Sequence, residues 1–191
     1  IFLGPDSVTL AVATVSGGKP AVSKVVTIPL EKILMPEGEA AKKRAFFDTD
    51  FLSRKEALAR AISSGMVEIG ARTKDVVVSL SHQVSITRYF LMNPVDKRFW
   101  KTSVQMEAKK YIPFPLDGLN NDFMVTPGIS EAKKNMLGVL LGVTPQLALN
   151  QVLGVVRGLG LNPIAVEPSH CSVMRQWQVA GVLGGDGQCQ V

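Results

Sequence analysis

Residues 136–168 read MLGVLLGVTPQLALNQVLGVVRGLGLNPIAVEP, and this stretch decides the class of fold. The apolar run over 137–143 predicts a strand, and NPIAVEP over 162–168 predicts a second one. Between them Thr144 offers a capping hydroxyl and Pro145 suits the first position of a helix. That helix carries an apolar stripe at Leu149, Val152, Val156 and Leu159. A β-α-β unit places its strands parallel, so we expect these two strands to be neighbours in one sheet.

Upstream of this unit the sequence predicts further strands and helices. Two β-branched runs over 7–30 flank Ser16-Gly17-Gly18-Lys19 and predict a hairpin. Residues 31–50 are mixed and charged and indicate a loop. Ser53 and Glu56 have capping-box spacing before an amphipathic helix over 54–69, and DVVVSL then predicts a buried strand. The chain is therefore mixed α/β.

The middle of the chain predicts a second β region. VSITRYFLM and NDFMVT indicate strands, and the helix between them should be stopped by Pro113, because proline lacks an amide donor. That helix is expected to bury one side, formed by Trp100, Val104, Ala108 and Tyr111.

The composition excludes several classes of protein. With 46% hydrophobic and 19% charged residues, the 191-residue chain forms one large domain or two subdomains that share a core. The net charge of +5 comes from short basic clusters, which are typical of solvated faces or of surfaces near anionic lipid or an acidic partner. No nucleic-acid-binding motif occurs.

Cys171 and Cys189 match neither zinc nor redox spacing, which indicates a reducing compartment. No transmembrane run or signal peptide is predicted, and the missing initiator Met suggests a start inside a longer protein.

The stretch 106–125, MEAKKYIPFPLDGLNNDFMV, resembles the type IV pilus assembly protein PilM family of bacterial inner-membrane platforms. In that actin-like family, a helix rich in Glu and Ala leads into Tyr-Ile-Pro-Phe-Pro and then into a strand that begins Asp-Phe or Asp-Tyr. The matching positions are Glu107, Ala108, Tyr111, Ile112, Pro113, Phe114, Pro115, Asp122 and Phe123. The order of elements is also similar to the first half of the family.

The resemblance implies an α/β, actin-like fold with a ribonuclease H-like core. Residues 1–80 would form the first part of that core, and 144–191 would return to it. Between them, 81–143 would form a small inserted α+β subdomain similar to that of the cell-division protein FtsA.

The resemblance also implies a nucleotide site, in a degenerate form. Gly4, Ser7 and Thr9 fall on the first phosphate-binding hairpin, but Phe2 replaces its acidic residue and Thr9 its lysine. Without that acid, metal positioning and water activation are not supported. A second phosphate loop would use Gly184, Gly185 and Asp186. ATP and Mg²⁺ are thus implied for the full-length protein, whereas for this chain alone we expect no cofactor, metal site or catalytic residue.

The function implied is that of a scaffold. The family binds a short N-terminal peptide of the membrane protein PilN between core and inserted subdomain, and Tyr111, Pro113 and Phe114 would form or shape that groove. These side chains could instead pack the core of the inserted subdomain.

The location implied by the resemblance is cytoplasmic and peripheral to the inner membrane, in a homo-oligomer or ring. Two alternatives stay open, an ATP-dependent switch and an FtsA-like cell-division protein. His82 and His170 are isolated and indicate no catalysis.

Overall fold

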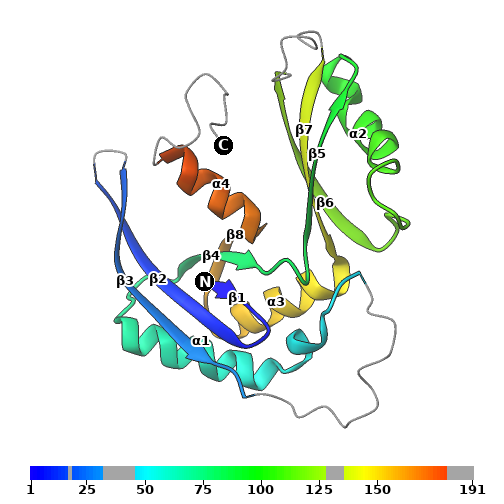
Figure 1. Cartoon of the computed structure of the whole chain (residues 1–191). Coiled ribbons are helices and arrows are strands. Elements are labelled where there is room, and N and C mark those ends of the chain that lie inside the picture. The colour runs from blue at the N-terminus through cyan, green and yellow to red at the C-terminus, as the bar shows by residue number, and fades with distance from the viewer. Residues whose placement is uncertain (17–18, 32–45, 128–135, 180–191) are drawn as a thin grey trace.

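The computed structural model describes residues 1–16, 19–31, 46–127 and 136–179, which form two sheets (Figure 1). The larger sheet has the strand order β3-β2-β1-β4-β8, and the smaller one has the order β5-β7-β6. The strands of the larger sheet are β1 Phe2–Leu3, β2 Ser7–Ser16, β3 Lys19–Pro29, β4 Asp75–Leu80 and β8 Asn162–Pro168. The smaller sheet contains β5 Ile86–Met92, β6 Leu119–Pro127 and β7 Leu137–Pro145. The helices are α1 Lys55–Ile69, α2 Trp100–Ala108, α3 Gln146–Gly158 and α4 Ser169–Val179, with short 3₁₀ turns at Asp50–Ser53 and Lys97–Phe99.

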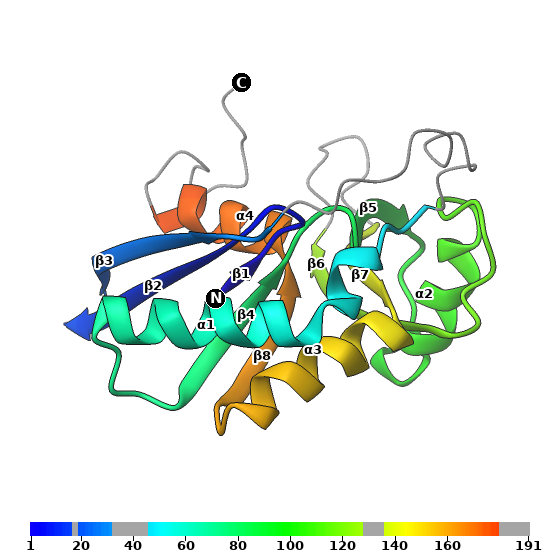
Figure 2. The ribbon, with the colours of Figure 1, turned by 90° about the horizontal axis from the view of Figure 1, so that it is seen from below.

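The larger sheet is covered by helices on both faces. The predicted hairpin is confirmed, because β2 and β3 pair antiparallel from Ser7↔Pro29 to Ser16↔Lys19. Helices α1 and α3 lie against one face, and α4 lies on the other (Figures 1 and 2). In β4 the residues Val76, Val78 and Leu80 point to the α1 and α3 side and are buried, while Val77 on the other face is half exposed. The burial alternates with the period of two that a strand imposes.

The expected pairing of 137–143 with 162–167 is wrong. Strand β7 lies in the smaller sheet and pairs antiparallel with β5 and β6, whereas β8 pairs parallel with β4. The reason is that Val139, Leu141 and Val143 of β7 are buried in a separate apolar cluster with Val104 and Ala108 of α2, which we call the α2 cluster. The parallel strands β4 and β8 are therefore joined through the whole smaller sheet and α3. A run of apolar residues predicts a strand but does not identify its partner.

The predicted helix starts also differ from the structure. The Thr144 hydroxyl donates to the carbonyl of Val84 at 2.6 Å and does not cap α3, which begins after Pro145. Ser53 donates to the carbonyl of Asp50 at 2.6 Å, and α1 begins at Lys55 without a side-chain cap. Each hydroxyl donates to a backbone carbonyl in place of accepting a helix amide. For Ser53 the carbonyl is three residues away, and for Thr144 it belongs to a distant segment, so the spacing of residues in the sequence does not reveal either bond.

Helix α2 ends earlier than predicted. It stops at Ala108, and the Ala108 carbonyl accepts the amides of Tyr111 at 3.0 Å and Ile112 at 2.9 Å in a closing turn. Pro113 has no amide to continue the ladder and disfavours helical geometry at Ile112, so the last turn unwinds before it. Val104 and Ala108 are buried as predicted, but Tyr111 keeps 43% of its surface exposed.

Each sheet has its own core. One cluster joins β1–β4 with α1 and α3, and a second one joins the smaller sheet with α2 and Ile112. Of the helices that the structure describes, none combines the length and apolar character needed to cross a membrane.

Candidate functional site

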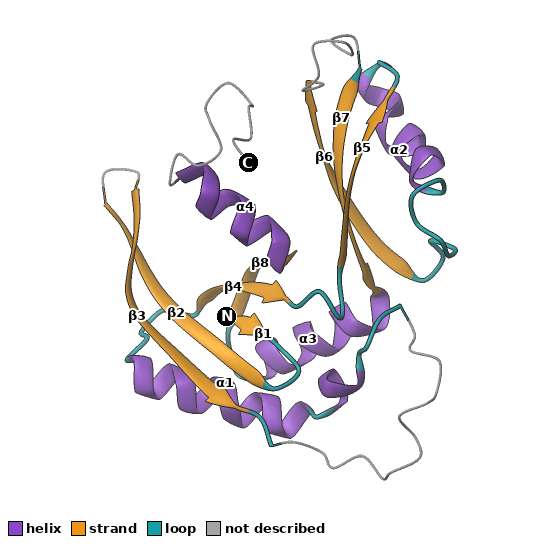
Figure 3. Ribbon diagram, viewed as in Figure 1, coloured by secondary structure: helices purple, strands orange, loops and turns teal. Residues whose placement is uncertain are grey.

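A groove of about 760 Å³ lies between the two sheets, and we call it the inter-sheet groove. One wall comes from β6 and β7, and the other comes from β8 and α4. Figure 3 shows α4 and the smaller sheet on opposite sides of this region. The lining residues are Leu80, Asn120–Met124, Leu140, Gly142, Val143, Thr144, Leu149, Val166, Glu167, Pro168, Cys171, Met174 and Arg175.

The floor of the inter-sheet groove depends on a glycine. A Cβ atom at Gly142 would lie 3.3 Å from Cγ of Pro168, closer than most Cβ contacts allow. The absence of a side chain therefore lets the end of β8 approach β7, and the two sheets meet there. A side chain at this position would require Pro168 to shift by a few tenths of an ångström.

The walls are mainly apolar. Met124 is 54% exposed and Met174 37% exposed, and both line the groove together with Leu140 and Val166. Because residues alternate across a strand, Leu140 faces the groove while its neighbours Val139 and Leu141 are buried in the α2 cluster. Thus β7 uses one face for folding and presents the other to the groove.

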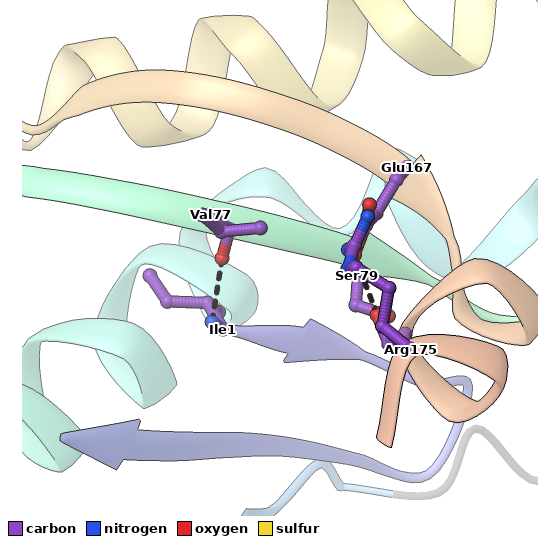
Figure 4. Close-up of polar contacts among 6 residues, drawn as sticks. Ile1, Val77, Ser79, Glu167 and Arg175 are labelled. Atoms are coloured by element: carbon purple, nitrogen blue, oxygen red, sulfur yellow. Dashed lines mark hydrogen bonds and ion pairs between the residues drawn. The ribbon is translucent and has the colours of Figure 1, made fainter. Parts of the chain in front are cut away.

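A polar network holds α4 against the larger sheet (Figure 4). The carboxylate of Glu167 at the end of β8 accepts the Ser172 hydroxyl at 2.7 Å and pairs with Arg175. Ser172 also lies 3.3 Å from the hydroxyl of Ser79 on β4. The network joins β4, β8 and α4, so it positions the helical wall of the groove.

Cys171 lines the same wall. Burial, and then the negative charge of Glu167, raise the pKa of the Cys171 thiol above its ordinary value, although Arg175 opposes them. The thiol therefore stays protonated near neutral pH, which suits an apolar wall better than a nucleophile.

The three residues predicted to bind the partner lie elsewhere. They are Tyr111, Pro113 and Phe114 of the Tyr-Ile-Pro-Phe-Pro segment, and we call them the hinge residues. Tyr111 stacks on Phe90 of the α2 cluster, with ring centroids 4.9 Å apart, and Pro113 is exposed. Phe114 packs against Phe46 at 4.6 Å and Phe47 at 5.5 Å.

These contacts place the hinge residues on the α2 side of the smaller sheet, and none of them lines the inter-sheet groove. Their role in binding stays a prediction. Sequence reasoning missed Phe46 and Phe47, although two adjacent aromatics within a charged stretch were a signal of a packing contact.

The predicted phosphate residues are only partly described. The Gly4 amide donates to the Ser7 carbonyl at 3.0 Å in the β1–β2 turn, and Thr9 shares a hydrogen bond with Thr27 at 3.0 Å. These groups are thus engaged within the protein, while Gly184, Gly185 and Asp186 lie outside the described residues. A phosphate-binding role stays a prediction for all of them. Within the described ranges, no cluster of His, Cys, Asp or Glu could hold a metal ion.

Comparison with known proteins adds to this geometry. The family model described as type IV pilus assembly protein PilM matches residues 8–179. The chain belongs to this family. A solved structure of a PilM–PilN type IV pilus biogenesis complex is similar, with a TM-score of 0.67 and 25% identity, over 94% of this chain and 49% of that one. The chain thus spans about half the length of the matched chain in that complex.

A second solved structure is less similar. It is the cytoplasmic domain of EpsL, an inner membrane component of the type II secretion system of Vibrio cholerae. The identity is 14% and the TM-score 0.49, over 87% of this chain and 55% of that one. A search of curated proteins gives no match. The coarser part of the predicted fold class, a mixed α/β fold that resembles PilM, is confirmed.

Proposed function

We propose that this PilM-family chain is a scaffold that docks a short N-terminal peptide of a PilN-like membrane protein in the inter-sheet groove. The observation that carries the proposal is an open, mainly apolar groove of about 760 Å³ with walls from two separate sheets. Its size is within the range of pockets that bind small ligands, so it can receive several side chains of a peptide. The similar solved structure is a complex of PilM with PilN, which supports this choice of occupant.

The chemistry of the walls suits a peptide with few anchors. A flexible segment loses conformational entropy when it binds, so a small number of buried apolar contacts must supply most of the affinity. Met124, Leu140 and Met174 offer adaptable apolar contacts, and methionine adjusts its shape to different ligands. Such a groove favours an apolar extended segment over a folded domain.

The proposal extends to location and organisation. We place the chain in the cytoplasm, at the inner-membrane platform of the pilus, as a partner of a membrane-anchored protein. We further propose an actin-like core over 1–80 and 144–191, interrupted by an inserted subdomain over 81–143. The separate apolar cluster of the smaller sheet supports this division.

A pair of methionine variants tests the groove. Met124→Ala removes an exposed side chain from the groove, and Met106→Ala removes a similarly exposed one from α2, outside the groove. We expect Met124→Ala to weaken binding of the N-terminal PilN peptide of the same pilus system about five- to thirtyfold, or about 1–2 kcal/mol, whereas Met106→Ala leaves it unchanged. Calorimetric titration measures both. Equal effects, or no binding by the unaltered chain, would contradict the proposal.

A further inference from the structure

We infer that the peptide binds as an added β-strand along the free edge of β6, and this inference rests on the proposed function. Strand β6 is at the edge of the smaller sheet, since its only described neighbour is β7. Five consecutive residues of β6, Asn120–Met124, line the inter-sheet groove. A strand that contributed one face alone would supply only alternate residues. The groove therefore runs along the backbone edge of β6.

The register shows which backbone groups point into that edge. In an antiparallel pair, residues alternate between those that bond the partner strand and those whose amide and carbonyl point away. Gln146 donates its amide to the Gly118 carbonyl at 3.0 Å, just beyond the pair Leu119↔Pro145. The Leu119 amide bonds the carbonyl of Leu116 instead, at 3.1 Å, and Pro145 has no amide. Hence even-numbered residues of β6 bond β7, and odd-numbered ones point away.

Two further observations agree with this assignment. The amide of Phe123 donates to its neighbour's side chain, Oδ1 of Asp122, at 2.8 Å. At the far end, Pro127 pairs with Leu137 and needs no amide there. The outward groups are therefore the carbonyls of Asn121, Phe123 and Val125 and the amides of Asn121 and Val125, while the Phe123 amide is bonded to Asp122. Their spacing of two residues matches one face of an extended peptide.

Charge adds a preference for the occupant. The lining residues carry two carboxylates, Asp122 and Glu167, and one guanidinium, Arg175. Glu167 pairs with Arg175, and Asp122 forms no ion pair with any residue of the described ranges. The groove thus has an excess of negative charge beside the outward amides. A peptide with a basic residue next to its apolar anchors complements it, as cytoplasmic segments close to a membrane span are often basic.

Backbone methylation of the peptide tests the inference on the unaltered chain. The probe is a fluorescent synthetic peptide of the N-terminal residues of PilN from the same pilus system, methylated at one backbone nitrogen at a time. We expect affinity to fall at every second position, about two- to tenfold for each lost hydrogen bond, and to stay unchanged at the positions between. Amide exchange of Asn121 and Val125 should slow when the unmodified peptide binds.

A pair of variants at one position gives the complementary test. Asn121→Pro removes an outward amide without breaking the ladder to β7, a position where proline is tolerated, and Asn121→Ala removes only the side chain. We expect the proline variant to bind about two- to tenfold more weakly than the alanine variant, with similar circular dichroism for both.

The outcomes separate this inference from the proposed function. Binding that is insensitive to the methylation pattern, with β6 amides that exchange at unchanged rates, would overturn the added strand and leave the groove as the docking site. If Met124→Ala weakens binding but methylation has the same effect at every peptide position, the added strand is likewise overturned and the groove remains the docking site. Absence of binding by the unaltered chain would overturn both. The methylation series needs no variant, so a proline variant that fails to fold does not prevent the test.

Discussion

Replacing Phe114 by Ala decides whether the Tyr-Ile-Pro-Phe-Pro segment packs the fold or binds the partner. Phe114 is half-buried on the α2 cluster and contacts the rings of Phe46 and Phe47, whose centroids lie 4.6 and 5.5 Å away. A fully buried Phe→Ala change costs about 3–5 kcal/mol, and each aromatic pair adds about 0.5–1.5 kcal/mol beyond burial. For a half-buried ring with two such partners we expect a loss of about 1.5–3 kcal/mol.

This loss should be visible in thermal and urea unfolding. For a chain of 191 residues, 1 kcal/mol corresponds to about 2–4 °C, so the melting temperature should fall by about 3–12 °C. Phe99 is an exposed phenylalanine, and Phe99→Ala serves as the control, with an expected change below about 0.5 kcal/mol. Because Phe114 does not line the inter-sheet groove, peptide affinity measured on folded Phe114→Ala protein should stay within about twofold of the original. A drop of tenfold or more with an unchanged melting temperature would refute this reasoning and establish the hinge as the binding site.

Further expectations concern nucleotide, packing and the groove thiol. Calorimetry with Mg²⁺-ATP should detect weak binding or none by this chain; a low-micromolar dissociation constant would contradict the degenerate phosphate motif. Gly65→Ala should destabilise the fold by about 1–3 kcal/mol in urea unfolding, because the added Cβ would lie 2.3 Å from Cδ1 of Leu10. The control is Gly154→Ala, which has open space around it and should stabilise the fold by up to about 1 kcal/mol. Equal effects of the two changes would contradict the packing of α1 on β2. In a Cys189→Ser chain, the raised pKa of Cys171 should make alkylation slow near neutral pH, with a half-maximal rate above the pH typical of exposed thiols, and bound peptide should slow it further. Rapid alkylation at neutral pH, unaffected by peptide, would contradict the assigned position.

The sequence by itself determined the kinds of element and the family. Two β-branched runs around a Gly-containing turn predicted the β2–β3 hairpin, and a short apolar run predicted β4. Apolar residues at helical spacing predicted α1 and α3. These patterns depend on local geometry, since a strand or helix must bury one face wherever it lies. The Tyr-Ile-Pro-Phe-Pro segment pointed to PilM because a double-proline aromatic turn after a helix is rare, and the family match over 8–179 confirmed it.

Only the tertiary structure decided which strands pair and where the groove lies. An apolar run such as LGVLLGV is compatible with several partners, and the choice of β5 and β6 for β7 depends on the α2 cluster, assembled from segments far apart in sequence. The groove likewise needs β6 and α4, about fifty residues apart along the chain, to face one another across Gly142 and Pro168. Pairing and grooves arise from packing between distant segments, and a local pattern constrains what each segment buries without specifying against which neighbour.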